Sequence, residues 1–530
     1  MENPASRVFG KNRQLKRIID MTKPHRAKAV MVLGTTSGAG KSWLTTALCR
    51  YYARQGLKVV PFKAQNMSNN ARVVAGAGAQ AGGEIGSAQY FQSLAACAVP
   101  EVRMNPLLLK PEHDTHSQVV LMGQVDEALS KMAWRGRSAS VWPVIAQALD
   151  ELIAENDVVV IEGAGSPAEI NLSACDIVNM RVALHADAAC LLVTDIDRGG
   201  AFAHLYGTWA LLPEAERALI KGYVLNKFRG DASLLAPAPE MLAQLTGVPT
   251  VATLPMWWQH GLPEEDGVFD DRSTLKGAVM LTVAVIAYPR ISNLDEFQPL
   301  KNVPGVRLQW VRSPSELAGL AMTDWIILPG SKNTSGDLAW LRQQGLDAAI
   351  AHHAGQGGAV LGICGGLQML GEALIDPHGV EHTYLSNAPG LGLLPLVTVF
   401  EADKTVQHTQ ACFDIGMAAA EVNNPWAALA GVQVAGYEIH HGQTQQHPAM
   451  AQSGDVARVV MPGGLAWQNG AGNVLGLYLH GLFEDPAALQ ALFGERLAGP
   501  VPTLDSVFEG LADYIDQHFE PGVLNGLIGR

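Results

Sequence analysis

The sequence predicts an α/β protein with two domains, each built on a parallel sheet. Short apolar runs rich in β-branched residues alternate with helical patterns over nearly all of the 530 residues, which is typical of parallel sheets covered by helices. One early run leads into a glycine-rich loop, and a later run ends at a cysteine between small residues. An acidic, turn-rich stretch separates the two series of runs, so we expect one domain on each side of it.

The expected strands and boundaries follow from this pattern. Strands are expected at 29–33, 58–62, 157–161, 189–194 and 222–226 in the first domain, and at 281–287, 324–328, 359–363 and 474–479 in the second. The pattern predicts a flexible basic leader over 1–28, a phosphate-binding domain over 29–262, a linker over 263–280 and a second domain over 281–530. An amphipathic pattern at 504–519 predicts a C-terminal helix that closes the second domain.

Composition and charge exclude several kinds of partner. With 37 basic and 50 acidic residues the net charge is −13, which argues against nucleic acid. The longest apolar stretch, 278–288, is shorter than the roughly 18 residues that a membrane-spanning helix needs. The six cysteines contain no CxxC pair, which disfavours a disulfide framework or a zinc ribbon. We therefore expect a cytoplasmic protein with neither a membrane nor a nucleic-acid partner.

A glycine-rich loop after the first strand predicts a nucleotide phosphate site. The loop consists of Gly34, Thr35, Thr36, Ser37, Gly38, Ala39, Gly40, Lys41 and Ser42. In such a loop the backbone N–H groups cradle phosphates, Lys41 reaches the outer phosphates of ATP, and Ser42 can hold Mg²⁺. Five residues separate Gly34 from Gly40, one more than in the usual loop, which indicates a variant subclass. The alternative is a glycine-rich turn that binds nothing.

A second Mg²⁺ ligand is expected at Glu162. This residue follows the buried strand 157–161, and the carboxyl ends of parallel strands are where α/β sheets bind ligands. The alternative is a carboxylate that merely faces water. Basic residues near other strand or loop ends are expected to be solvated surface charges, namely Lys63, Lys110, Arg198, Lys227 and Arg229.

A strand, a sharp turn and a helix around Cys364 predict a nucleophile. This arrangement exposes the thiol, places it near a helix N-terminus where its pKa falls, and leaves the N–H of Gly365 free to bind an oxyanion. The turn at Gly330 and Ser331, which ends another apolar strand, can supply a second donor. The other five cysteines are interpreted as small buried hydrophobic residues.

The thiolate needs a base, and the sequence favours His480. It ends the apolar strand 474–479, and a histidine at a strand end opposite a nucleophile turn is the expected partner. His440 remains the second candidate.

Motifs in both halves carry a resemblance to known families. The first domain resembles the dethiobiotin synthetase-like ATPases, and the second resembles the class I, or triad, glutamine amidotransferases. Over roughly 28–520 the chain is similar to the glutamine-dependent cobyric acid synthase family. The shared motifs lie at 61–67, 105–111, 117–120, 195–200, 226–231, 289–293, 328–334 and 436–440.

The resemblance implies a ligase that amidates the b, d, e and g carboxylates of adenosylcobyrinic acid a,c-diamide. Glutamine would donate the nitrogen, ATP would activate each carboxylate, and the partners would be these small molecules. The family's nucleophile falls on Cys364 and its base on His480, with Gly330, Ser331, Gly365 and Gln368 assigned to oxyanion and glutamine binding. The alternatives are cobyrinic acid a,c-diamide synthase, another glutamine-dependent amide ligase, or a phosphate-loop switch protein with an inactive second domain.

The sequence does not identify the residue that orients His480. Triad amidotransferases usually carry a glutamate two residues after the histidine, and here that position is Leu482. The family is known to lack that glutamate. Glu484 and Glu438 are the nearest candidates in sequence.

Overall fold

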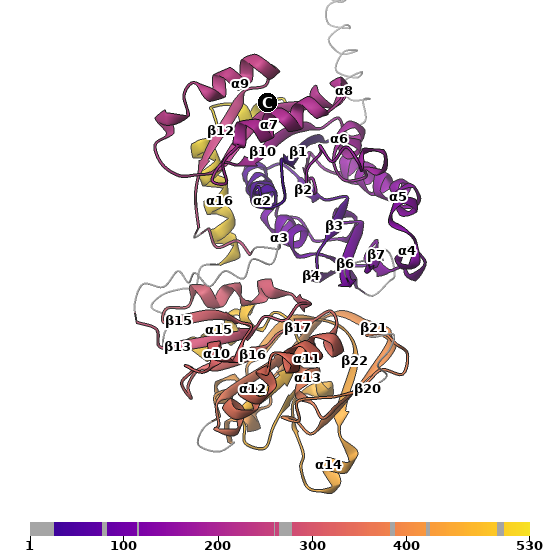
Figure 1. Cartoon of the computed structure of the whole chain (residues 1–530), viewed down its shortest axis with the longest axis vertical. Helices are drawn as coiled ribbons and strands as arrows, with labels where there is room; N and C mark the ends of the chain where they lie inside the picture. The colour runs from indigo at the N-terminus through magenta and orange to yellow at the C-terminus, as the bar shows by residue number, and fades with distance from the viewer. Residues whose placement is uncertain are drawn as a thin grey trace, which may run out of the picture.

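The computed structural model describes residues 26–76, 82–113, 116–258, 260–263, 278–381, 387–419, 424–494 and 503–530. The expected leader lies outside the described residues except for 26–28, and so does most of the expected linker. The chain forms two α/β units that are stacked along the long axis of the molecule (Figure 1). The predicted fold class, two α/β domains with parallel sheets, is confirmed.

A six-stranded parallel sheet forms the centre of the first unit. Its order is β12-β11-β10-β1-β9-β2. The strands are β1 (Lys28–Gly34), β2 (Val59–Phe62), β9 (Val158–Glu162), β10 (Ala189–Asp195), β11 (Ile220–Phe228) and β12 (Thr250–Pro255). The strands are buried on both faces because β-branched and aliphatic residues follow one another without polar alternation.

Helices cover both faces of this sheet. Met31 and Leu33 of β1 pack on one face with α5 (Trp134–Glu155), α6 (Met180–Ala186), α7 (Ala201–Leu211) and α9 (Ala238–Thr246). Val30 and Val32 point to the other face, towards α2 (Lys41–Ala53) and α3 (Ser87–Ala95). At the lower edge of this unit lie a hairpin and a small sheet, made of β4 (Ala71–Val74), β5 (Gly83–Gly86), β3 (Gln65–Met67), β6 (Leu107–His113), β7 (His116–Leu121) and β8 (Gln124–Val125) (Figure 1).

The second unit is built on a seven-stranded sheet of order β15-β13-β16-β18-β25-β24-β23. The five strands from β15 to β25 pair in parallel, whereas β24 pairs antiparallel with both β25 and the edge strand β23, a feature that the sequence did not predict. The strands are β13 (Leu281–Ile286), β15 (Val306–Val311), β16 (Trp325–Leu328), β18 (Ala359–Ile363), β23 (Arg458–Met461), β24 (Ala466–Gln468) and β25 (Val474–Leu477). Its helices include α11 (Thr334–Gln343), α12 (Leu346–Gly355), α13 (Gly365–Leu370) and α15 (Pro486–Phe493).

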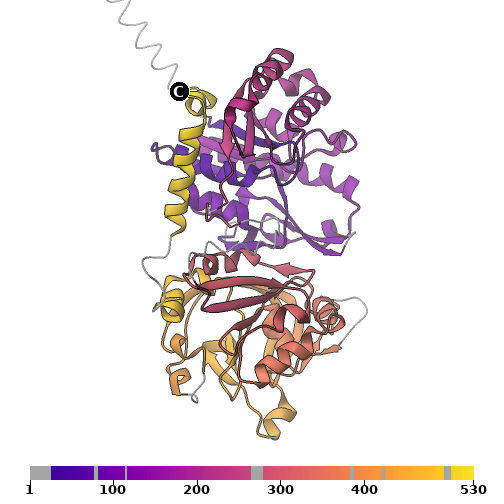
Figure 2. The same ribbon diagram turned by 60° about the vertical axis from the view of Figure 1, so that its left-hand side comes forward.

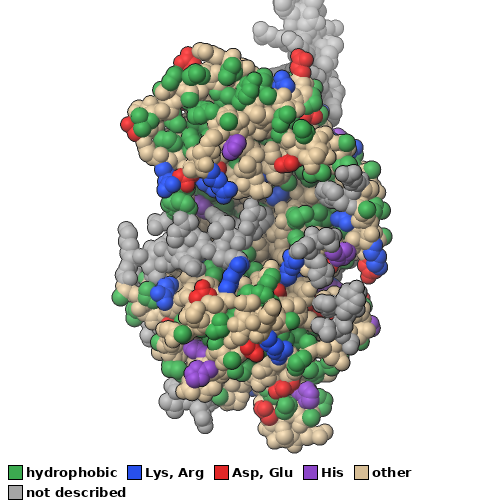
Figure 3. All heavy atoms as spheres, viewed as in Figure 1, with side chains coloured by type: hydrophobic (Ala, Val, Ile, Leu, Met, Phe, Trp, Pro, Cys, Tyr) green, Lys and Arg blue, Asp and Glu red, His purple; other side chains and the backbone are tan. Residues whose placement is uncertain are grey.

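Two smaller sheets complete the second unit. One joins β14 (Ile291–Ser292) to β17 (Gly330–Ser331), and the other has the order β20-β19-β21-β22. The long strands β21 (Leu396–Cys412) and β22 (Gln433–Gln446) pack against β4 of the first unit. The approach of β21 is so close that a Cβ built on Gly82 would lie 2.4 Å from the Val406 carbonyl oxygen. Basic side chains lie on both sides of the junction between the units (Figure 3). In the described part of the chain, no helix is long and apolar enough to cross a bilayer.

The C-terminal helix corrects one prediction. Helix α16 (Leu504–His518) forms where the amphipathic pattern placed it, but it packs on the first unit beside α2 and not on the second (Figure 2). Its buried side chains are Phe508, Leu511, Ala512 and Ile515. An amphipathic pattern shows that one face of a helix is buried but does not identify the surface that buries it, which is why the prediction was wrong.

Polar contacts fix this helix on the first unit. Arg50 of α2 donates to Asp505, and Arg54 Nη1 donates to Asp513 Oδ1 at 2.5 Å. Beyond the helix, the backbone N–H of Glu520 donates to the Val251 carbonyl at 2.9 Å. The chain therefore passes from the first unit to the second and returns to the first.

We expect Phe508→Ala to destabilise the first unit. The side chain is 2% exposed and packs in the core that α2 shares with the sheet, so its removal should lower the free energy of unfolding by about 3–5 kcal/mol. Urea denaturation monitored by tryptophan fluorescence measures this loss. Gln517→Ala, at an exposed position of the same helix, is the control and should change stability by less than about 0.5 kcal/mol. Equal effects of the two substitutions would contradict the packing of Phe508 between α16 and the first unit.

Candidate active sites

The phosphate loop joins β1 to α2, and its glycines are required by the backbone. Gly38 and Gly40 have φ of 72° and 100°, a region that L side chains rarely adopt. A Cβ on Gly40 would lie 2.0 Å from Asn226 Nδ2, and that amide donates to the Ala39 carbonyl at 2.9 Å. Lys41 Nζ donates to the carbonyls of Thr36 and Gly165 at 3.1 and 3.2 Å. The loop is thus wrapped around the ammonium group that was predicted to face the phosphates.

Glu162 lies beside this loop, as the sequence predicts. Ser42 Oγ donates to Glu162 Oε1 at 2.8 Å, and Lys63 Nζ donates to the same oxygen at 2.9 Å. Gln92 Nε2 of α3 donates to Glu162 Oε2 at 2.5 Å. Burial raises the pKa of Glu162, but the charge and hydrogen bond of Lys63 outweigh it and leave that pKa lowered. A hydroxyl and an ionised carboxylate beside a phosphate loop fit Mg²⁺, which takes one or two protein ligands and completes its shell with phosphate oxygens and water.

The basic residues that the sequence assigned to the surface are not all surface charges. Lys63 and Lys110 are buried in ion pairs with Glu162 and Glu84. Near the phosphate loop, Lys227 Nζ donates to the Gly38 carbonyl at 2.8 Å and lies 3.2 Å from Asp195 Oδ2. Arg198 Nε lies 3.4 Å from the same carboxylate oxygen, and Arg229 pairs with Asp197.

Cys364 occupies the sharp turn between β18 and α13. Its φ of 51° and ψ of −105° are unusual for a residue other than glycine, and strained backbone of this kind is typical of a nucleophile between a strand and a helix. The turn needs small neighbours, because a Cβ on Gly366 would lie 1.8 Å from the Leu328 carbonyl oxygen of β16. Cys364 Sγ lies 3.7 Å from the Ile439 carbonyl oxygen.

His480 lies next to this cysteine, and its partner is Glu296. The ring Nδ1 is 3.2 Å from Glu296 Oε1 and 3.3 Å from Asn293 Nδ2. The second carboxylate oxygen, Oε2, accepts from the Gly481 N–H at 3.0 Å. Burial lowers the pKa of His480, but Glu296 and the hydrogen bond to Cys364 prevail and raise it to about 10. The arrangement favours the protonated, imidazolium form of His480, with Glu296 as its counter-ion.

The two glutamates that were closest in sequence do not orient His480. Both carboxylate oxygens of Glu484 accept from Arg72, at 2.6 and 2.7 Å. Glu438 Oε2 lies 3.2 Å from His440 Nε2, and its other oxygen accepts from Gln407 at 2.8 Å. Sequence reasoning missed Glu296 because it lies 184 positions before His480. Its burial on a 3-10 helix, η4 (Leu294–Asn302), leaves no local pattern that marks it as a partner of His480.

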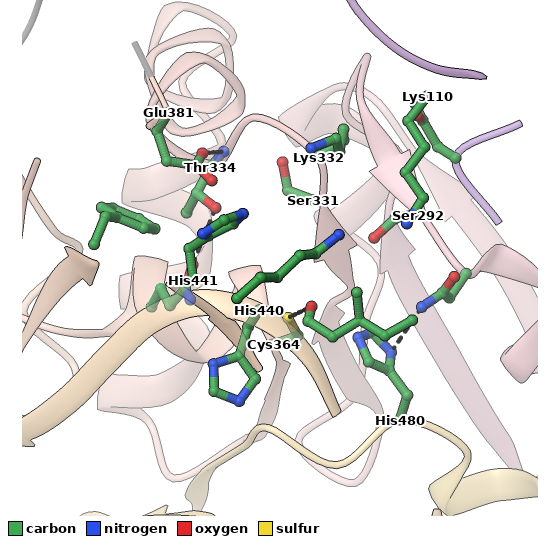
Figure 4. A pocket seen from close by; sticks show the side chains of 16 residues that line it. Lys110, Ser292, Ser331, Lys332, Thr334, Cys364, Glu381, His440, His441 and His480 are labelled. Carbon is green, nitrogen blue, oxygen red and sulfur yellow. Dashed lines mark hydrogen bonds between the residues drawn. The ribbon is translucent and has the colours of Figure 1, made fainter. Parts of the chain in front are cut away.

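The residues assigned to the oxyanion and to glutamine surround Cys364. Ser331 and Gln368 line one pocket with Cys364 and His480, as Figure 4 shows for the labelled residues. Gly330 and Gly365 belong to the backbone beside it, because a Cβ on Gly365 would lie 2.8 Å from the Ser331 nitrogen. Thr334 Oγ1 fixes Gln368 by donating to its Oε1 at 3.0 Å.

Both units contribute to this pocket. Asn69 and Lys110 come from the first unit. The second unit adds Lys404, together with five residues that Figure 4 labels: Lys332, Thr334, Glu381, His440 and His441. The candidate nucleophile therefore lies at the junction between the two units.

These geometries define a class of protein, in which a nucleotide-binding unit is joined to a glutamine amidotransferase unit. Residues 30–262 match the family model described as CobQ/CobB/MinD/ParA nucleotide binding domain. Residues 282–488 match the family model described as CobB/CobQ-like glutamine amidotransferase domain.

Relatives that span nearly the whole chain identify the family. A protein named cobyric acid synthase from Polaromonas naphthalenivorans is 78% identical over 502 residues, which cover 95% of this chain and 99% of that protein. Proteins of the same name are 78% identical in Albidiferax ferrireducens (95% and 99% covered) and 74% identical in a Polaromonas species (95% and 98% covered). The chain belongs to the cobyric acid synthase family.

We expect Glu296→Gln to impair glutamine hydrolysis and to change its pH dependence. Without the carboxylate the pKa of His480 falls, so the imidazolium loses its proton at a lower pH and the alkaline limb of the kcat/KM profile moves to lower pH. The rate at neutral pH should fall on the order of 10²- to 10⁴-fold, as when a triad loses its orienting carboxylate. Ammonia release from glutamine, measured across the pH range, reports both effects.

Glu438→Gln is the matched control, because it removes a buried carboxylate near the pocket that contacts His440 and not His480. Its alkaline limb should stay in place. An unmoved alkaline limb in the Glu296→Gln protein would contradict the role assigned to Glu296.

Proposed function

We propose that this protein uses ATP and glutamine to convert adenosylcobyrinic acid a,c-diamide into adenosylcobyric acid by amidating its b, d, e and g carboxylates. One observation carries the proposal: a phosphate loop and a Cys364–His480–Glu296 site occur in one chain, on two units that share a pocket. The relatives that cover the chain are named cobyric acid synthase, which favours this substrate over that of the a,c-diamide synthases.

The first unit would activate the carboxylate. A carboxylate is a poor electrophile, so ATP would convert it to an acyl phosphate, with Lys41 and the loop N–H groups neutralising the transferring phosphoryl group. Ser42 and Glu162 would hold Mg²⁺, which supplies further neutralisation of phosphate charge when bound. The hydrogen bond between these two side chains supports that assignment.

The second unit would release ammonia from glutamine. Cys364 would attack the amide carbon, and His480 would give its proton to the departing ammonia, leaving a thioester. The N–H groups around Gly330, Ser331 and Gly365 would stabilise the oxyanion. Water would then hydrolyse the thioester to glutamate, with His480 accepting the proton. Glu296 would hold His480 in the required orientation throughout.

Ammonia would pass directly from one unit to the other. In bulk water most of it would be protonated and unreactive, so a shared pocket at the junction favours efficient transfer. Asn69 and Lys110 of the first unit line the pocket beside Cys364, which supports such transfer.

We further propose that the protein acts in the cytoplasm, since its six cysteines are free, and that its net charge of −13 keeps it from binding nucleic acid.

Two substitutions should separate the half-reactions. Cys364→Ala should lose glutamine-dependent synthesis by at least about 10³-fold and keep ammonia-dependent synthesis at high ammonium and alkaline pH. Lys41→Ala should lose synthesis from both nitrogen sources, because no acyl phosphate forms. Product mass, followed in amidation steps with each nitrogen source, measures both.

The two variants control for each other, since each keeps the half-reaction that the other lacks. A Cys364→Ala protein that still used glutamine, or a Lys41→Ala protein with wild-type turnover on ammonia, would contradict the two-site mechanism. A substrate panel distinguishes the sibling ligases, because acceptance of cobyrinic acid itself would favour the a,c-diamide synthase alternative.

A further inference from the structure

The first unit holds the segment that orients His480. This segment, 293–296, belongs to the second unit and carries both side chains that contact His480 Nδ1. The N–H of Ala71 on β4 donates to Asn293 Oδ1 at 2.9 Å, and the N–H of Leu294 donates to Asn70 Oδ1 at 3.2 Å. The candidate glutaminase site is thus completed by contacts from the other unit.

Arg72 of the first unit makes the strongest of these contacts. Its guanidinium donates to Asp295, the neighbour of Glu296, and to both carboxylate oxygens of Glu484. The side chain is 2% exposed, and its guanidinium carbon lies 5.0 Å from the Phe91 ring centroid and 5.1 Å from that of Tyr437. The Tyr437 ring in turn stacks on His480, with centroids 5.3 Å apart. Arg72 therefore touches the surroundings of His480 on two sides.

Arg72 not only joins the two units but also balances the charge of carboxylates that lie close to His480. Asp295, Glu296 and Glu484 are all on the second unit and lie close together, and Arg72 is the cation that pairs with two of them. A buried carboxylate without a cation takes up a proton. Burial raises the pKa of Glu484, and the charge of Arg72 opposes that rise. Arg72 therefore acts on the charge of a carboxylate that lies near Glu296 and His480, so it bears on the chemistry at Cys364.

Arg72 is also connected to the phosphate loop. It packs against Tyr90 and Phe91 of α3, and the next residue of that helix, Gln92, donates to Glu162. One helix therefore contacts both the carboxylate beside the phosphate loop and the guanidinium that holds the segment 293–296.

We propose that Arg72 is a positioning residue for glutamine hydrolysis, through which the first unit fixes Asp295 and thereby the orientation of Glu296 and His480. The inference rests on the function proposed above. Glutamine is then hydrolysed efficiently only when the first unit is seated on the second. Since ammonia released without a synthetase partner would be lost, this dependence protects glutamine from futile hydrolysis.

The test compares Arg72→Met, which removes the charge, with Arg72→Lys, which keeps a cation near Asp295. We expect Arg72→Met to lower kcat for glutamine hydrolysis on the order of 10²-fold, as a small misplacement of a catalytic group does. The KM for glutamine and the ammonia-dependent synthesis should change by no more than about twofold, since neither depends on the orientation of His480. Arg72→Lys should recover part of the lost kcat.

The pH profile distinguishes positioning from mere structural support. In Arg72→Met the pKa of Glu484 should rise further, because the charge that opposes the effect of burial is gone, so the acidic limb of glutamine hydrolysis should move to higher pH. The titratable or charged groups that face this cluster are Asp295, Glu296, Glu484, Tyr437, Tyr90, Tyr288, Cys364 and His480. Asp295→Asn combined with Arg72→Met removes one carboxylate together with the cation, and should bring the acidic limb back towards its wild-type position.

The control is Glu112→Gln, which breaks the 3.1 Å ion pair with Lys332 at the same junction without touching the segment 293–296. It should leave the acidic limb and the glutaminase kcat within about twofold of wild type. Arg72→Met with an unchanged kcat and acidic limb, or with glutaminase and ammonia-dependent synthesis lost in parallel, would overturn the inference. Absence of glutamine hydrolysis in the wild-type protein would instead refute the proposed function.

Discussion

The buried ion cluster at the junction is the constraint on which the arrangement of the two units depends. Arg72 of one unit and Asp295 of the other are almost completely buried, and removing one partner of such a pair typically costs about 3–5 kcal/mol because the remaining charge has no counter-ion. If the two units separated, Arg72 and Asp295 would each have to be solvated by water, or the carboxylate would have to take up a proton. The charges of Asp295 and Glu484 on the second unit are therefore balanced only when the first unit places Arg72 beside them.

The glutaminase site is assembled from segments that are distant in the chain. Cys364 follows β18, His480 follows β25, and Glu296 belongs to η4, ahead of both. Adjacent parallel strands bring the first two together, because β18 and β25 pair in the sheet and their carboxyl ends lie side by side. Glu296 reaches His480 by a different route, since the segment before it is hydrogen-bonded to the first unit. The sheet thus positions the nucleophile and the base, whereas the junction positions the orienting carboxylate.

The features that the sequence predicted correctly are those encoded by residues that are contiguous in the chain. The phosphate loop and the turn at Cys364 each combine a strand, glycines with a specific backbone requirement and a helix within about fifteen residues, so their local geometry is readable. The C-terminal helix was predicted as an element but assigned to the wrong unit, because its apolar face carries no information about its partner. Glu296 and Arg72 were missed for a similar reason: a charged residue is usually exposed, and only tertiary packing shows that these two are buried and paired.

The path of the chain explains how a junction with buried charges can form at all. The chain enters the second unit at β13 and returns to the first with α16, so two covalent connections tie the units together. Each connection raises the effective concentration of one unit near the other, to millimolar levels for short linkers, which offsets part of the cost of desolvating Arg72 and its carboxylates. A second connection also limits the relative motions of the units to those compatible with both attachments. The return of α16 to the first unit therefore favours a closed junction, which is the condition that transfer of ammonia between the two proposed sites requires.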